Sequence, residues 1–262
     1  MRWSQLRSRA LLRPGGRLDI DVGQIRGAGL RVLERGQFRA RGHLSVPGPA
    51  PGIHSLCTYV VDLDRGLAVL STVTAMDPET TDDQPLLSAP VTQWSIQDGL
   101  LVPLPSAEAT GTLWACVPGE PLIQGPLAML LWLAGALTAE ATPSGAAWST
   151  VVDVDRAVEH VASQHRSALQ RSFAESGLEG GSQLELEVRL NAGAVQTLDA
   201  ELPAVQGVRP RALLHLAIDA GQPPAVPEPP VAGEVADPDE IARAWAIDWP
   251  DDLPVRQPWH RT

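Results

Sequence analysis

The sequence predicts an α+β domain, in which an antiparallel sheet packs with two or more helices, followed by a proline-rich C-terminal extension. Candidate strands fill the first part of the chain and return near its end, and the helical stretches are confined to an insertion between them. Helices do not alternate with single strands, as they would in a parallel sheet. The 262 residues, 44% hydrophobic and 19% charged, suit one sizeable domain. We divide the chain into a basic N-terminal segment (1–22), the α+β domain (23–219) and a tail (220–262).

The first strand is predicted from an alternation with a period of two. Between Gly36 and Pro47, apolar or small residues occupy every second position and polar residues the positions between them. Two further extended stretches, Ile53 to Leu63 and Leu67 to Met76, flank a tight turn at residues 64–66 and predict an antiparallel hairpin. Three short strands are expected after them, over residues 91–96, 100–104 and 112–117.

The middle of the chain predicts two helices. Residues 127–141 are rich in Leu and Ala without enrichment in β-branched residues, which favours a mostly buried helix. After a strand at 146–153, apolar side chains recur at helical spacing over 155–175, and this pattern predicts an amphipathic helix capped by Asp155 and ended by Gly177. Three strands are expected to complete the sheet, over residues 183–190, 195–202 and 212–218.

The N-terminal segment is basic. Residues 1–50 contain ten arginines against Asp19, Asp21 and Glu34. A helix there would place Trp3, Leu6 and Ala10 on one side and arginines on much of the remainder, so peripheral contact with an anionic membrane surface is one hypothesis and a frayed or locally docked end is the other. No apolar run follows the arginines as in a secretory signal, and we therefore expect a cytoplasmic protein.

The tail is rich in proline and tryptophan. Prolines at five positions between 223 and 230 predict an extended linker, and residues 237–245 predict a short helix. Trp245, Trp249 and Trp259 follow in an acidic stretch. Tryptophans gathered in this way indicate either a strap onto the protein's own domain or a docking segment for a partner protein or a second copy.

Composition excludes several classes of protein. The net charge is −11, which disfavours a nucleic-acid-binding surface. All 20 basic residues are arginines, a bias typical of GC-rich bacterial genomes of the actinobacterial type. The longest apolar stretch, 126–139, is shorter than the roughly 20 residues of a transmembrane helix. Two cysteines are too few for a disulfide framework or a four-cysteine zinc site, and no phosphate-binding loop or metal-ligand spacing occurs, so no cofactor is expected.

Apolar and aromatic side chains are the main candidates for a binding site. If the sheet and the apolar helix enclose a cavity, we expect them to line it; they are Leu44, Tyr59, Trp94, Trp114, Leu130, Trp132 and Trp148. A filled core is the alternative, and sequence does not distinguish the two. Cys57 and Cys116 lie in predicted strands, where a small buried side chain is usual, and a cysteine nucleophile assisted by His54 or His165 has no local support.

The order of elements resembles the LolA/LppX-LprG-like superfamily. The resemblance lies in the run of antiparallel strands, the apolar Leu/Ala helix, the strand–helix junction at 152–157 and the hairpin at 184–195, and it covers residues 23–202. It implies a half-barrel in which a curved sheet wraps over helices and holds acyl chains or lipoglycans between the two layers. Those carriers are exported or lipid-anchored, and this sequence shows neither their signal nor their anchoring cysteine. The family has no catalytic signature to transfer.

Three hypotheses about function follow. The first is a non-enzymatic carrier whose half-barrel binds a hydrophobic small molecule or acyl chain. The second is a protein–protein interaction module or assembly factor with a filled core. The third is an enzyme of the cyclase or isomerase type that acts on a hydrophobic metabolite through polar groups such as Tyr59, His54 or Asp153.

Overall fold

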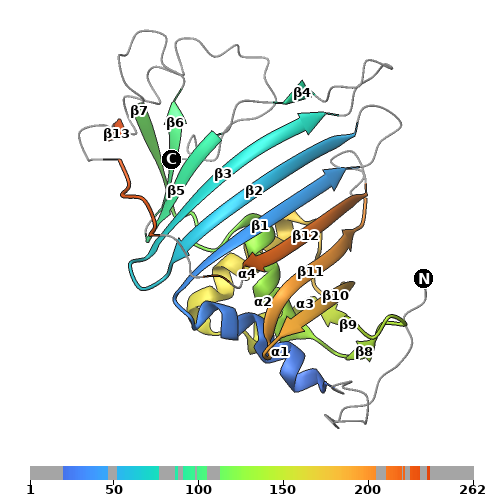
Figure 1. Cartoon of the computed structure of the whole chain (residues 1–262). Helices are drawn as coiled ribbons and strands as arrows, with labels where there is room; N and C mark the ends of the chain where they lie inside the picture. The colour runs from blue at the N-terminus through green and yellow to red at the C-terminus, as the bar shows by residue number, and fades with distance from the viewer. Residues whose placement is uncertain are drawn as a thin grey trace.

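The described strands form one strongly curved sheet with the helices gathered against one of its faces (Figure 1). This computed structural model describes residues 20–46, 52–76, 86–87, 91–97, 99–104, 113–204, 211–219, 221, 225–230 and 235–236. The helical segments are α1 (Val22–Leu33), η1 (Gly125–Ala128), α2 (Met129–Trp132), η2 (Leu133–Gly135), α3 (Val154–His160), η3 (Ser163–His165) and α4 (Arg166–Glu175). The α+β class with a curved antiparallel sheet is confirmed.

The sheet has 13 strands within the described residues, in the order β13-β7-β6-β5-β3-β2-β1-β12-β11-β10-β9-β8, with β4 paired to β3 beside this path. All pairs are antiparallel except β13 with β7. The strands of the first half are β1 (Gln37–Val46), β2 (Ile53–Asp62), β3 (Leu67–Met76), β4 (Leu86–Leu87), β5 (Val91–Ile96), β6 (Gly99–Leu104) and β7 (Leu113–Pro118). Those of the second half are β8 (Glu140–Ala141), β9 (Trp148–Asp153), β10 (Gln183–Asn191), β11 (Ala194–Leu202), β12 (Ala212–Asp219) and β13 (Val235–Ala236).

Alternation along the strands assigns every side chain to one of two faces. On β1, Phe38 and Ala40 are buried against the helices, and the register places Val61 and Tyr59 of β2 opposite them. We call this side the core face and the other side the outer face. The core face of β10 to β12 is formed in the same way by buried leucines, valines and alanines, so one hydrophobic core runs under most of the sheet.

The buried helical segment is shorter and less regular than the sequence predicts. Instead of one helix over 127–141, η1, α2 and η2 together span 125–135. Gly135 packs so closely on β9 that an added Cβ would lie 2.2 Å from the Asp153 carbonyl oxygen. The chain then turns extended at Ala136, and the Leu137 amide donates to Val151 O at 2.7 Å. Pairing with β9 therefore ends the helix.

The amphipathic stretch at 155–175 also divides in two. Val161 and Ala162 are extended and separate α3 from η3 and α4. Asp153, and not Asp155, caps α3 by accepting the Arg156 amide, while the Asp155 carboxylate accepts the Gly181 amide. Gly177 lies beyond α4 with a positive φ of 67°, which confirms it as the residue that ends this helix.

Helix α1 was not predicted. Asp21 and Gln24 form a capping box at its start, in which each side chain bonds the backbone amide of the other residue. Gly29 then lets α1 lie directly on the backbone of α2, since an added Cβ would be 2.0 Å from Leu130 O.

Part of the C-terminal extension lies on the outer face. Val226 is buried there with Leu67 and Val69 in a second small core, to which Trp94 and Ile96 add their side chains. Glu228 pairs with Arg65 at 2.8 Å, and β13 continues the sheet beside β7. The predicted helix at 237–245, the three tail tryptophans and residues 1–19 lie outside the described residues. No helix in the described ranges is long and apolar enough to span a membrane.

Candidate functional site

The helical segments cover the core face of β1 and β2 at only one end of these strands. Gly42 marks the boundary, because it allows Pro126 of η1 to contact β1; a Cβ there would lie 2.9 Å from Pro126 Cβ. Toward the start of β1, Phe38 and Ala40 are covered by the helical segments. Toward its end, Leu44 and Val46 are only half-buried. The helices therefore fill the concave side over part of the strand length.

The core face also presents partly exposed apolar side chains at three further positions: Ile53 lies beyond Gly42, Val91 lies level with Gly42, and Leu70 lies level with Tyr59. Ile53 of β2 lies opposite Val46 and is 45% exposed. Val91 of β5 is 43% exposed, and Leu70 of β3 is half-buried. We call this surface, made of Leu44, Val46, Ile53, Leu70 and Val91, the open groove. It is the part of the concave side on which an apolar ligand could lie against the sheet.

The seven predicted ligand-binding residues do not form one site. Leu44 belongs to the open groove, and Tyr59 lies at its inner boundary beside Gly42. Trp148 is half-buried at the far edge of the same core. The others have different positions, which correct the prediction of a single cavity lined by all seven.

Two of these residues fill the core, and two lie on the wrong face. Leu130 and Trp132 are each only 1% exposed; the Trp132 ring stacks on Phe173, and its Nε1–H donates to Ser172 Oγ at 3.0 Å. Trp94 and Trp114 pack edge to face with centroids 4.7 Å apart on the outer face, beside the small core that Val226 covers. The sheet therefore separates these two tryptophans from the open groove.

Polar groups at the groove are uncharged, and Ser55, Thr72 and Thr74 share the core face of β2 and β3 with the groove residues. Tyr59 is buried, and burial, followed by the nearby Cys57, raises the pKa of its phenol. The Cys57 thiol lies 3.7 Å from Thr72 Oγ1. His54 and Cys57 point to opposite faces of β2, because three positions separate them, so His54 cannot activate this thiol. His165 is the last residue of η3 and the N-cap residue of α4.

A cavity of about 510 Å³ lies where α4 meets the strand ends. Its apolar wall includes Ile123 and Ala168, and its polar wall includes Arg171, which pairs with Glu120 at 2.7 Å and with Glu175 at 3.2 Å. Burial lowers the pKa of His165 at the rim of this cavity. Burial also raises the pKa of Glu175, and Arg171 opposes that change. The arginine is saturated by these partners, so the cavity offers it to no anion.

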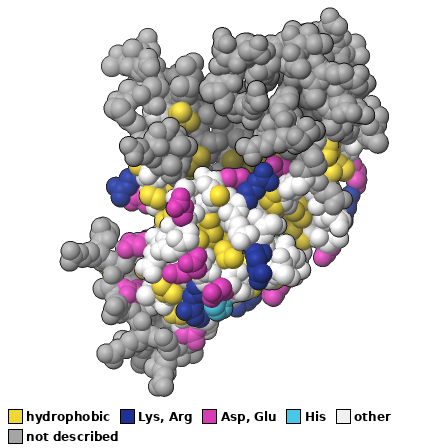
Figure 2. All heavy atoms as spheres, turned by 180° about the vertical axis from the view of Figure 1, so that it is seen from behind, with side chains coloured by type: hydrophobic (Ala, Val, Ile, Leu, Met, Phe, Trp, Pro, Cys, Tyr) yellow, Lys and Arg dark blue, Asp and Glu magenta, His cyan; other side chains and the backbone are white. Residues whose placement is uncertain are grey.

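Charged side chains of both signs are interspersed with apolar ones on the surface seen from behind (Figure 2). Within the described ranges, no three His, Cys, Asp or Glu side chains are grouped as a metal site would require. The five residues of the open groove are all apolar.

Comparisons with known proteins leave the chain without a family. No family model and no curated protein matches the sequence. Among solved structures, it is similar to the bifunctional dehydratase-cyclase domain of ambruticin biosynthesis, with 16% identity over 75% of this chain and 79% of that one and a TM-score of 0.16. It is also similar to a dehydratase structure from work on the borrelidin and fluvirucin polyketide synthases, with 10% identity over 81% and 82% and a TM-score of 0.17. Similarities this low assign neither fold nor activity.

Proposed function

We propose that the protein is a non-enzymatic carrier that holds an acyl chain or a similar hydrophobic molecule in the open groove. One observation supports this most directly: apolar side chains on the concave side of the sheet stay partly exposed where the helical segments end, with Ile53 at 45% exposure. Isolated exposed apolar residues are ordinary, but several of them on one concave face, contributed by β1, β2, β3 and β5, suit a ligand surface.

The proposal includes the half-barrel architecture of the LolA/LppX-LprG-like superfamily. The sheet order, in which β1 lies between β2 and β12, and the placement of the helices on one face support that assignment. In this arrangement the acyl chain would lie between the sheet and the end of η1, with Gly42 and Tyr59 as the floor of the site.

The binding energy available is adequate for a carrier. Burying about ten methylene groups at about 0.8 kcal/mol each gives a gross gain of about 8 kcal/mol, before the cost of ordering the ligand is subtracted. A reversible micromolar complex corresponds to about the same value. A chain longer than ten methylenes, or a polar contact at its end, therefore has to offset the ordering cost.

The test compares two substitutions on the same strand. Ile53→Glu places a charge on the core face, and Leu56→Glu places the same charge on the outer face; their parent side chains are 45% and 50% exposed, so both variants are expected to fold. We expect titration with a dansyl-labelled undecanoic acid to show affinity lowered roughly tenfold or more by Ile53→Glu, since loss of one apolar contact is worth about 1.5 kcal/mol. Leu56→Glu should bind as the parent does.

Native mass spectrometry of freshly purified protein, followed by organic extraction, identifies any natural ligand. A co-purifying lipid that Ile53→Glu loses and Leu56→Glu keeps would support the carrier. Equal uptake by the two variants, or no binding by the parent, would contradict it and leave the interaction module with a filled core as the better hypothesis.

A further inference from the structure

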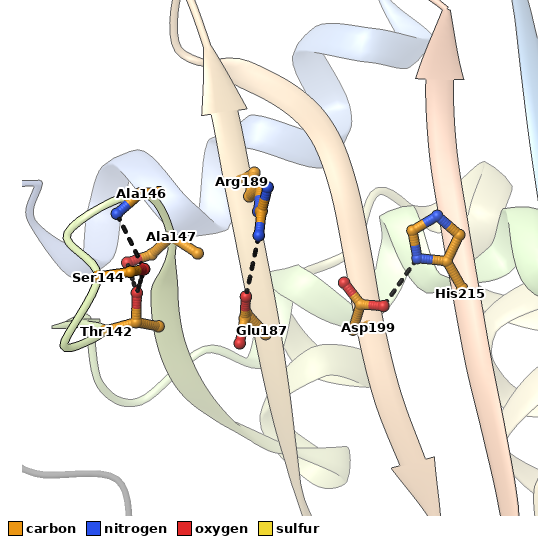
Figure 3. A network of polar contacts seen from close by, with 8 residues as sticks. All are labelled: Thr142, Ser144, Ala146, Ala147, Glu187, Arg189, Asp199 and His215. Carbon is orange, nitrogen blue, oxygen red and sulfur yellow. Dashed lines mark hydrogen bonds and ion pairs between the residues drawn. The ribbon is translucent and has the colours of Figure 1, made fainter.

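The outer face carries a polar surface that the carrier hypothesis does not use. Side chains of four adjacent strands, β10, β11, β12 and β1, surround a hollow of about 540 Å³. We call this surface the outer patch; it comprises Glu185, Glu187, Asp199, Glu201, Leu213, His215, His43 and Ser45. Figure 3 shows Glu187, Asp199 and His215 projecting from three of these strands on the side away from the helices.

The pairing register arranges the outer patch in rows. Glu187, Asp199, His215 and His43 lie opposite one another in sequence across the four strands. The carboxylates thus gather on β10 and β11, and the histidines on β12 and β1. Next to the histidines, His54 of β2 stacks on His43 with ring centroids 5.6 Å apart.

The outer patch is acidic on balance at neutral pH. Its four carboxylates meet two arginines: Arg189, whose guanidinium is 3.9 Å from Glu187, and Arg211, which pairs with Glu201. His215 donates from Nδ1 to Asp199 Oδ1 at 2.7 Å. These arginines are largely exposed, so water screens their attraction for the carboxylates. The patch keeps an excess of negative charge for an additional cation.

Apolar surface accompanies this charge. Leu213 lies within the outer patch and is 47% exposed, and Leu56 lies across His43 on β2 and is 50% exposed. Charge next to exposed leucine suits a segment that has both arginine and leucine. Free solvent ions would satisfy the carboxylates but would leave the leucines uncovered.

We propose that the arginine-rich N-terminal segment of this chain, residues 1–19, docks on the outer patch. The segment has five arginines and one acidic residue, Asp19, and it also contains Trp3 and four leucines. It is thus complementary to the patch in charge and in apolar character. The body of the domain supplies the acidic half of the interaction and the segment the basic half.

The point where the segment joins the domain favours this contact within one chain. Arg26, one turn into α1, donates from Nε to Ala136 O at 2.8 Å, and Ala136 bridges to Val152 of β9. β9 pairs with β10, which carries Glu185 and Glu187. The start of α1 therefore lies at the sheet edge closest to the carboxylates. An extended chain of 19 residues reaches about 60 Å, whereas two strands cover about 10 Å.

A photo-crosslink in the full-length protein tests the proposal. Leu6 is replaced by p-benzoylphenylalanine, the protein is irradiated at low concentration, and the crosslinked peptides are mapped by mass spectrometry. We expect crosslinks within the monomer to peptides covering 183–202 or 211–219. Glu185→Gln with Glu187→Gln should lower the yield roughly two- to thirtyfold, the effect of losing two exposed charge pairs, and high salt should do the same.

The matched control is Glu159→Gln with Glu179→Gln, which removes the same charge from exposed positions outside the outer patch and should leave the yield unchanged. Crosslinks to another surface, or a yield that the Glu185 and Glu187 changes do not lower, would overturn the proposal. Covalent dimers would overturn it too, because the segment would then belong to a second copy. Loss of the crosslink on adding phosphatidylglycerol vesicles, with no response to the glutamine changes, would make the membrane the occupant instead.

Discussion

Replacing Gly29 by alanine would force α1 away from the segment that it covers. The new Cβ would lie 2.0 Å from Leu130 O and 2.8 Å from the Leu130 carbonyl carbon. An ordinary contact between carbon and oxygen is about 3.3 Å, so the two backbones would have to separate by roughly 1.3 Å. Overpacking of this kind costs about 1–3 kcal/mol, and the upper end applies because backbone is the obstacle. The higher helix propensity of alanine offsets about 0.5–1 kcal/mol of this destabilisation.

We therefore expect Gly29→Ala to lower the free energy of unfolding by about 2 kcal/mol. For a chain of this size, this corresponds to a melting temperature about 4–8 °C lower. Gly27→Ala is the control in the same helix, because the added Cβ there meets the Arg31 guanidinium and no backbone atom. It should change the free energy of unfolding by less than about 1 kcal/mol. Urea titrations followed by circular dichroism measure both variants. Equal stability of the two would refute the close approach of α1 and α2.

Two further predictions concern the small outer core and the α4 cavity. Val226→Asp should release residues 225–230 from the outer face, because it places a charge in the small outer core. Emission spectra should then show the fluorescence of Trp94 shifted toward longer wavelength. An unchanged spectrum would exclude Val226 from that core. Because burial lowers the pKa of His165 below its usual 6.5, the unfolded chain takes up the proton first, so stability should fall as pH decreases below about 6.5. His165→Gln should reduce this loss of stability at low pH without altering stability at pH 8. If the urea midpoint changes equally between pH 8 and pH 5 in the variant and in the parent protein, the prediction is wrong.

Local sequence patterns predicted the strands well. The alternation from Phe38 to Val46 identified both β1 and the side chains that share its core face, including Leu44. The alternation of side chains between the two faces can be predicted from sequence, because it depends only on the pleat of one strand. Helix α1 shows the reverse case: Gly23, Gly27 and Gly29 lower its helical propensity, and only the Asp21–Gln24 capping box signals its start.

The sequence of a single strand does not reveal which side chains share a site, because this depends on strand pairing and on the packing of distant segments. Trp94 and Ile96 alternate with polar residues along β5, yet they are half-buried on the outer face beside Val226, some 130 positions later. Leu130 and Trp132 are apolar in sequence in the same way whether they line a cavity or fill a core. The outer patch depends likewise on the register of four strands, which places His43 opposite His215 and could not be read from either strand alone.

The pairing of β1 with β12 has a consequence for biosynthesis. As many as 166 residues separate Val46 from Ala212, so the whole first half of the sheet leaves the ribosome before its central neighbour exists. At translation rates of about 5–20 residues per second, the unpaired edge of β1 stays without its partner for about 10–30 s. An exposed strand edge of ten residues is a template for association with other nascent chains. We expect this protein to require a holding chaperone during translation. Completion of the sheet should be limited by the synthesis of β12, its last long strand.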